Sequence, residues 1–175
     1  AIKLNPKDAQ SHYEFGKLVS SQGKWSRAQS LLSNAIALNP GYGPSHYELG
    51  SVFLGRGEFD SARDEFQKAL DMEPENSDFT IGMAMALVEK NQLDKSLNIL
   101  IPLSKKEPNN SKAFYAMCNV YTKKRFLTVA TRHCEKSFEL NKDDYETMNR
   151  LAWLYSKKNI NLKKAFDLSN KTLIA

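Results

Sequence analysis

Residues 43–76 read GPSHYELGSVFLGRGEFDSARDEFQKALDMEPEN. Near the end of this stretch lies Pro74, which follows Pro40 by 34 residues, and Pro6 and Pro108 extend the same spacing in both directions. A fixed period of this length in a chain of 175 residues predicts an array of short supersecondary units, each of which buries its apolar face against its neighbours.

Each unit carries large apolar and small residues at fixed positions. The units begin at Ala9, Gly43, Ser77, Ser111 and Tyr145. Positions 7 and 11, one helical turn apart, hold Phe15 and Val19, Leu49 and Phe53, Met83 and Leu87, Met117 and Tyr121, and Leu151 and Tyr155. Position 8 holds Gly16, Gly50, Ala84, Cys118 and Ala152, and position 20 holds Ala28, Ala62, Ser96, Ala130 and, after a one-residue insertion, Ala165. An apolar stripe at helical spacing, with a small residue on each of two segments, predicts two closely packed antiparallel helices per unit.

The junction between the two helices is also marked in the sequence. Position 15 of the first three units holds Gly23, Gly57 and Asn91. These residues tolerate the left-handed backbone conformation that ends a helix. The fourth unit has Arg125 there, so we expect its hairpin to be less regular. Side chains that can cap the second helix stand at position 18, namely Ser26, Asp60, Asp94 and Thr128.

With its five-fold recurrence, this pattern resembles the tetratricopeptide repeat family over nearly the whole chain. The resemblance implies an all-α fold, a right-handed superhelix (solenoid) of about ten antiparallel helices. The repeats would span residues 9–42, 43–76, 77–110, 111–144 and 145–175, the last with its insertion and cut short, and residues 1–6 would be the tail of a preceding repeat. The last repeat is also similar to the closing repeat of bacterial members, some of which serve in envelope assembly, polysaccharide export or secretion.

Members of this family bind partners through a concave groove lined by their first helices. The resemblance assigns to that groove Tyr13, Lys17, Tyr47, Ser51, Leu54, Ile81, Met85, Val88, Tyr115, Asn119, Asn149 and Trp153. Tyrosine suits recognition because its rigid ring has a polar tip and little rotamer entropy to lose. The same ring also packs between repeats at this position, so Tyr47 and Tyr115 have both a binding and a packing interpretation.

One subtype of the family grips the carboxyl terminus of heat-shock chaperones with basic and Asn residues. The corresponding positions here hold Tyr13, Lys17, Glu48, Asp78 and Gly82. The two acidic side chains would repel a carboxylate, so a chaperone-tail clamp is not expected.

Charge differs between the two halves of the chain. Residues 1–87 have a net charge of −3 and residues 88–175 a net charge of +8, which gives +5 in total. The basic half could attract an acidic partner, a nucleic acid or an anionic membrane, but a solvated lysine-rich outer face is the simpler interpretation. No regular code of base-reading residues appears, which disfavours nucleic acid.

Two further features bear on where the chain belongs. No apolar run reaches the length of a membrane span. The first residues lack the basic leader and apolar core of a signal peptide, so we interpret the chain as a piece of a longer protein.

The sequence offers little for catalysis. It contains no phosphate loop, dinucleotide fingerprint or zinc-peptidase motif, so we expect no enzyme activity, cofactor or metal. His12 and His46, at position 4 of successive repeats, are expected to pack at interfaces. Cys118 and Cys134 fall on facing helices, where we expect small buried thiols and, in an oxidising compartment, a disulfide instead.

The pattern as a whole favours a non-catalytic scaffold that binds a protein or peptide within a larger protein or assembly. Two alternatives remain open. The chain could be a self-associating spacer that stacks through its terminal repeats, or the regulatory arm of an enzyme whose catalytic domain lies outside this fragment.

Overall fold

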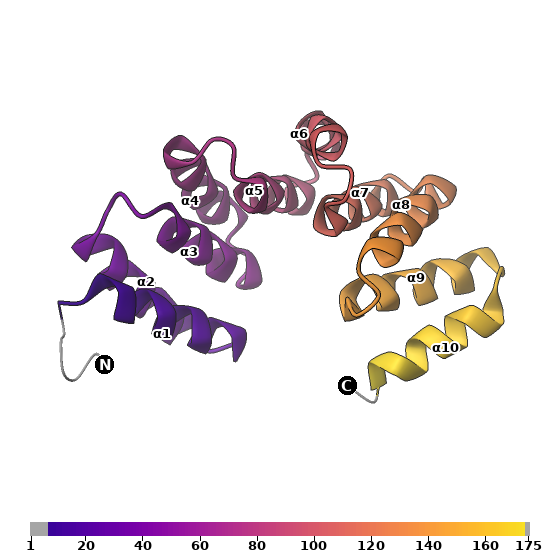
Figure 1. The fold of residues 1–175 in the computed structure, drawn as a ribbon, viewed down its shortest axis with the longest axis horizontal. Coiled ribbons are helices and arrows are strands. Elements are labelled where there is room, and N and C mark those ends of the chain that lie inside the picture. Colours follow the sequence, from indigo (N-terminus) through magenta and orange to yellow (C-terminus); the bar gives the residue numbers. More distant parts are fainter. Residues whose placement is uncertain (1–6, 174–175) are drawn as a thin grey trace. The chain divides into compact units, whose positions relative to one another are not determined.

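The computed structural model describes the backbone of residues 7–173, and within this range the regular structure is entirely α-helical (Figure 1). The helices are α1 (Ala9–Ser21), α2 (Trp25–Leu38), α3 (Gly43–Gly55), α4 (Phe59–Met72), α5 (Ser77–Glu89), α6 (Leu93–Lys106), α7 (Ser111–Lys123), α8 (Leu127–Leu140), α9 (Tyr145–Lys158) and α10 (Leu162–Leu173). The predicted all-α fold class is confirmed. Every odd-numbered helix begins at the first residue of a predicted repeat. The tail assigned to residues 1–6 lies outside the described residues.

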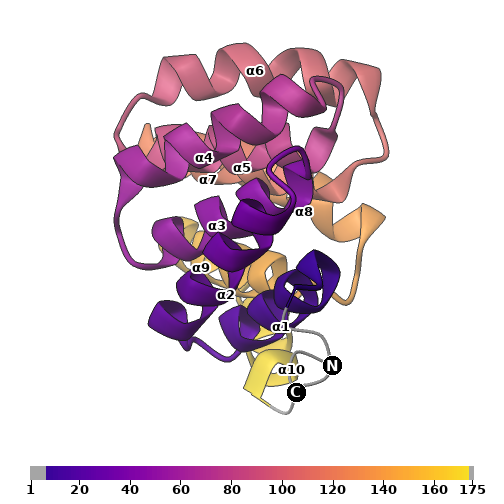
Figure 2. The ribbon, with the colours of Figure 1, turned by 90° about the vertical axis from the view of Figure 1, so that its left-hand side faces the viewer.

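The chain divides into two compact units between Asn91 and Gln92. In unit 1, α1 packs against α2 and α3 against α4, while α2 also packs against α3 and α4 against α5 (Figures 1 and 2). In unit 2, α6 packs against α7, α7 against α8, α8 against α9 and α9 against α10. Most helix contacts in each unit are between consecutive helices, and in unit 1 the first helices of neighbouring repeats, α1 with α3 and α3 with α5, also touch, as expected for a repeat protein.

Unit 1 is held together where a large side chain fills the space left by glycines. The Phe66 ring of α4 is fully buried. A Cβ added to Gly50 in α3 would lie 2.8 Å from this ring, and one added to Gly82 in α5 would lie equally close. Gly16 and Leu32 repeat the arrangement between α1 and α2, again at 2.8 Å. Position 8 is thus small because the side chain at position 24 occupies its space.

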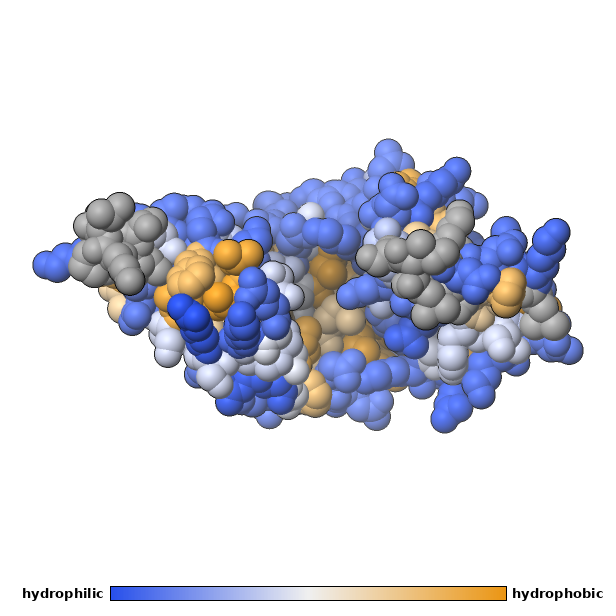
Figure 3. All heavy atoms as spheres, turned by 90° about the horizontal axis from the view of Figure 1, so that it is seen from below, coloured by the Kyte–Doolittle hydropathy of each residue, from blue (hydrophilic) through white to orange (hydrophobic). Residues whose placement is uncertain are grey.

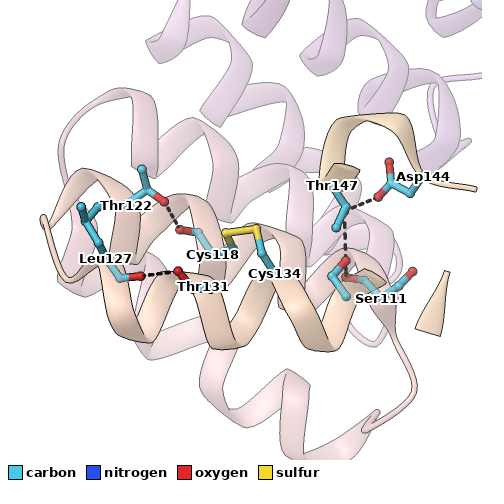
Figure 4. Close-up of a disulfide and its surroundings, with 9 residues drawn as sticks. Ser111, Cys118, Thr122, Leu127, Thr131, Cys134, Asp144 and Thr147 are labelled. Atoms are coloured by element: carbon cyan, nitrogen blue, oxygen red, sulfur yellow. Dashed lines mark hydrogen bonds between the residues drawn. A yellow bond between two sulfur atoms is a disulfide. The ribbon is translucent and has the colours of Figure 1, made fainter. Parts of the chain in front are cut away.

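A disulfide takes the place of this contact in unit 2. Cys118 and Cys134 stand at positions 8 and 24 of their repeat, with their Cα atoms 5.3 Å apart and both side chains fully buried (Figure 4). The two cysteines are buried as expected, and of the two redox states that the sequence left open the structure has the disulfide, because the positions brought closest by the hairpin lie within its span. The bond joins α7 covalently to α8.

The turn between helices is left-handed at position 15 in all five repeats. The φ angles are 71° at Gly23, 78° at Gly57, 57° at Asn91, 66° at Arg125 and 52° at Asn159. The Arg125 turn also keeps the backbone hydrogen bonds of the Gly23 turn, because Phe126 N–H donates to the Tyr121 carbonyl as Lys24 N–H does to Val19. The expectation of a less regular fourth hairpin was wrong at this turn, since the packed helices impose the conformation on arginine.

The predicted caps of the second helices are also corrected. These helices begin one residue earlier than the predicted caps, at position 17, and their N-cap residues make no side-chain capping bond. Asp60 instead pairs with Lys90, and Asp94 pairs with Lys124 at 2.6 Å, each thirty residues further along the chain. Side-chain caps occur on the first helices, from Asp8, Asn76, Asn110 and Asp144.

The histidines at position 4 are buried as predicted. The His46 ring is only 6% exposed. Its Nδ1 lies 2.7 Å from a Glu65 carboxylate oxygen, and its Nε2 lies 3.3 Å from the Pro40 carbonyl oxygen. His46 therefore connects α3 to α4 and to the turn before α3, as expected for a histidine at a helix interface.

Replacing Gly82 with alanine should lower the free energy of unfolding by about 1–3 kcal/mol, because the new methyl group overpacks the Phe66 and Tyr47 rings. The better helix propensity of alanine returns at most about 1 kcal/mol. Gly41→Ala is the control, since a Cβ there meets only the Asn39 side chain at 4.0 Å. Denaturant unfolding measures both variants, and equal midpoints would contradict the packing role of Gly82.

Replacing Arg125 with glycine should stabilise the chain by about 0.5–1 kcal/mol. A left-handed residue with a Cβ is disfavoured by about 1–2 kcal/mol, and the greater unfolded-state freedom of glycine offsets only part of that gain. Arg125→Ala separates backbone conformation from charge, because alanine keeps the Cβ and should not raise the urea midpoint. A midpoint that rises equally for both variants would refute this explanation.

Candidate functional site

The residues predicted to line a groove all lie on first helices, and burial divides them into three sets. Three are buried, namely Tyr13, Val88 and Asn119. Six are partly buried, namely Tyr47, Ser51, Leu54, Ile81, Met85 and Tyr115. Three are exposed, namely Lys17, Asn149 and Trp153. Val88 is only 1% exposed, so its side chain serves packing. The binding role of the remaining residues stays a prediction.

The two predicted groove tyrosines of unit 1, Tyr13 and Tyr47, pack against other rings. Tyr13 meets Tyr42 edge to face, with ring centroids 5.2 Å apart. Tyr47 stacks on Phe79 at 5.2 Å and contacts the Phe66 ring at 5.5 Å. Burial raises the pKa of Tyr13 and of Tyr47 to about 12, so both hydroxyls stay protonated at neutral pH. The packing interpretation of Tyr47 thus has direct support, and its remaining exposed edge is what a partner could contact.

A half-buried carboxylate lies beside these tyrosines. Burial raises the pKa of Glu48, and the nearby charges of Glu14 and Asp78 raise it further, while Lys17 opposes them. The charge of Glu48 also acts on the hydroxyls of Tyr13 and Tyr47. This part of unit 1 therefore has a negative potential that disfavours an anionic group and favours a cation.

In unit 2, an open hollow of about 470 Å³ lies between α7 and α9. It is lined by Tyr115, Glu146, Asn149, Arg150 and Trp153. The structure thus brings together three predicted groove residues. Sequence reasoning missed Glu146 and Arg150, which occupy positions 2 and 6 of the last repeat and lie beside the predicted positions on the same helix face.

The Tyr115 hydroxyl interacts with the side chains of Asn119 and Arg150. Burial raises its pKa, and hydrogen bonding to the side chains of Asn119 and Arg150 opposes the rise. The Asn119 amide therefore lies next to the hydroxyl of Tyr115, one of the residues that line the hollow. Over the exposed Trp153 ring, the Lys157 ammonium is 5.9 Å from the ring centroid.

A second hollow, of about 480 Å³, lies among α8, α9 and α10 and was not predicted. Its lining residues are Glu135, Phe138, Glu139, Leu151, Tyr155, Lys164 and Asp167. The Tyr155 hydroxyl donates to a Glu135 carboxylate oxygen at 2.8 Å. The family resemblance directs attention to first helices, so it gave no signal for this hollow.

We also searched the described residues for metal-binding groups and for membrane-spanning helices. Among the described residues, no group of three His, Cys, Asp or Glu side chains could hold a metal ion. No helix in the described part of the chain is long and apolar enough to cross a membrane. Figure 3 shows hydrophobic patches on a mainly hydrophilic face. The large apolar side chains with substantial exposure are Leu18, Leu38, Met72, Phe126, Tyr145, Trp153, Ile160 and Phe166.

Several solved structures share this fold. A thermophilic tetratricopeptide repeat protein of Thermus thermophilus, TTC0263, superposes with a TM-score of 0.86 at 20% identity, covering 95% of this chain and 90% of that one. YrrB, described as a tetratricopeptide repeat protein with an unusual peptide-binding site, has a TM-score of 0.63 at 23% identity and covers 98% and 88%. PilF of Pseudomonas aeruginosa has a TM-score of 0.74 at 21% identity and covers 93% and 73%.

Sequence comparison points the same way. No curated protein matches the chain. Two models of the tetratricopeptide repeat match it, one over residues 13–78 and the other over residues 53–119. Together with the helix starts and the structural neighbours, these matches establish that the chain belongs to the tetratricopeptide repeat family.

Proposed function

We propose that this chain is a non-catalytic scaffold that binds a protein or peptide through the first-helix faces of its two units, within a larger protein or assembly. The observation that carries the proposal is the partial exposure of apolar and aromatic side chains on those faces. Ile81 and Met85, one turn apart on α5, are only partly buried, whereas Ala62, Phe66 and Ala69 in α4 are fully buried. Such half-exposed apolar groups have contact area left for a partner.

The family supports this interpretation. Tetratricopeptide repeats are interaction modules, and the similar structure of YrrB is described by its peptide-binding site. At such low identity the likeness carries the fold alone, so the partner must be inferred from the residues of this chain. The negative potential around Glu48 in unit 1 supports the expectation that a chaperone-tail carboxylate is not the partner.

Self-association remains the second candidate, because apolar side chains are also exposed on the first and last helices. Leu18 on α1 is 54% exposed and Phe166 on α10 is 65% exposed. Stacking of these helices between copies would cover both side chains. Light scattering across protein concentrations distinguishes the candidates, since stacking predicts growth of the particle mass and a peptide-binding monomer does not.

A variant that combines Ile81→Ala and Met85→Ala should weaken binding of selected peptides by about tenfold or more, because both substitutions remove contact area from the proposed face. The peptides are selected from a random phage-displayed library on the unmodified chain and then titrated calorimetrically as synthetic peptides. The matched control combines Leu38→Ala and Met72→Ala, which remove exposed apolar groups near the ends of α2 and α4.

The control variant should bind within about twofold of the unmodified chain, and thermal melting should show that both variants fold. Two results would count against the proposed face. The library could yield no binding peptide, or the two variants could lose affinity equally.

A further inference from the structure

The hairpin turns of the last two repeats carry an apolar side chain at their tip. Position 16 of each repeat directly follows the left-handed residue of the turn. It holds Lys24, Glu58 and Gln92 in the first three repeats, but Phe126 and Ile160 in the last two. Phe126 is 54% exposed and Ile160 is 37% exposed. The last two turns thus present apolar tips where the first three present polar ones.

The two apolar tips lie on one edge of unit 2. Equivalent turns of neighbouring repeats are adjacent in this fold, because Lys124 of the fourth turn lies 2.6 Å from Asp94 at the start of α6. Helix α8 packs against α9 as α6 packs against α7, so the fifth repeat stacks on the fourth in the same way. This stacking places Phe126 and Ile160 on neighbouring turns of the same edge.

Positive charge surrounds both tips. We call residues 121–130 and 155–164 the basic turn edge, because they contain seven Lys or Arg residues and no Asp or Glu. The seven are Lys123, Lys124, Arg125, Lys157, Lys158, Lys163 and Lys164. In the second and third repeats the charges at this place are mixed. Residues 53–62 carry one basic and two acidic residues, and residues 87–96 carry two of each.

The backbone of both tips is hydrogen-bonded within its own turn. Phe126 N–H donates to the Tyr121 carbonyl oxygen at 2.9 Å, and Ile160 N–H donates to the Tyr155 carbonyl oxygen at 3.0 Å. The residue before each tip also donates its N–H within the turn, at 3.1 Å. These N–H groups need no water, so both turns can enter a medium of low polarity without leaving them unpaired.

An exposed apolar tip within a ring of cations suits the surface of an anionic bilayer. Lysine and arginine can keep their charges at lipid phosphates while their aliphatic stems and the apolar tips lie deeper. A nucleic acid would also attract the cations. It would leave Ile160 uncovered, because this side chain has no ring on which a base could stack. A bilayer covers both tips and meets both turns at once.

We propose that the basic turn edge docks unit 2 onto an anionic lipid bilayer, with Phe126 and Ile160 at the boundary between headgroups and acyl chains. The cations of the edge lie at the lipid phosphates. The contact is peripheral. It does not use Ile81 and Met85 of the proposed peptide-binding face, so it goes beyond the proposed function and can be tested separately.

The first test is co-sedimentation with vesicles of phosphatidylcholine, either alone or mixed with phosphatidylglycerol. The whole chain should bind the mixed vesicles only, and less strongly as salt is added. A tip variant that combines Phe126→Ala and Ile160→Ala should bind about tenfold or more weakly, because less apolar area is inserted. The control combines Leu38→Ala and Met72→Ala, which remove exposed apolar groups elsewhere, and should bind within about twofold of the unmodified chain.

The second test removes charge. A variant that combines Lys157→Gln and Lys163→Gln should bind the mixed vesicles about tenfold or more weakly. The matched control combines Lys105→Gln and Lys142→Gln, which remove the same charge from exposed positions near the carboxyl ends of α6 and α8. These positions lie at the opposite end of the hairpins, so the control should stay within about twofold. Thermal melting checks that every variant folds.

The third test locates the tip in the bilayer. With Phe126→Trp, the fluorescence of the introduced tryptophan should shift to shorter wavelength on mixed vesicles, and acyl chains carrying bromine should quench it. The unmodified chain gives the background of Trp25 and Trp153. Leu38→Trp is the control and should show neither change, because Leu38 is exposed at the carboxyl end of α2.

Several results would overturn the proposal. The whole chain could fail to bind mixed vesicles, or the tip variant could bind them as well as its control does. Binding that depends on Lys157 and Lys163 but not on the tips would indicate an electrostatic contact without insertion. A single-stranded oligonucleotide that binds equally well to the whole chain and to the tip variant, and displaces the vesicles, would favour nucleic acid. Peptide binding can succeed or fail without changing any of these outcomes.

Discussion

The nesting of unit 1 depends on the space that two glycines leave for one phenylalanine. The Phe66 ring lies so close to Gly50 of its own hairpin and Gly82 of the next that neither position could carry a Cβ without displacement. Because interiors are close-packed and short contacts rise steeply in energy, this single ring fixes the spacing of three helices. The faces that α3 and α5 present to solvent follow from that spacing.

Unit 2 meets the same geometric requirement by a covalent route. In unit 1, Gly50 has no side chain and leaves room for the large Phe66 ring. In unit 2, the corresponding residues Cys118 and Cys134 both have a side chain, and the two sulfur atoms are covalently bonded. Shape complementarity keeps α3 and α4 together only while the neighbouring contacts hold, whereas a disulfide restricts the unfolded chain as well. Helix α7, which contributes Tyr115 to the hollow, is thus tied to α8 independently of the packing around it.

The 34-residue period predicted the helices because equivalent positions in successive repeats pack against equivalent neighbours, so the same residue types recur there. It could not predict interactions whose partners lie elsewhere. Asp60 has the side chain of a helix cap, but it is already the second residue of α4, and its partner is Lys90 in the next repeat. Arginine disfavours the left-handed backbone conformation, yet the two packed helices hold Arg125 in it.

The candidate site shows the same limit at the level of single positions. Position 9 is exposed in Lys17 and Trp153 but buried in Asn119, although the family pattern treats them alike. The burial of a side chain depends on the size of the side chains that adjacent helices place against it. The residue pattern along a single helix does not contain that information. A repeat protein gains stability mainly from contacts between neighbours, so an unpaired amide in one such contact is a local loss that nearby packing must offset. The disulfide at Cys118 and the fully buried Val120 are contacts of this kind, directly before and after Asn119 in the chain.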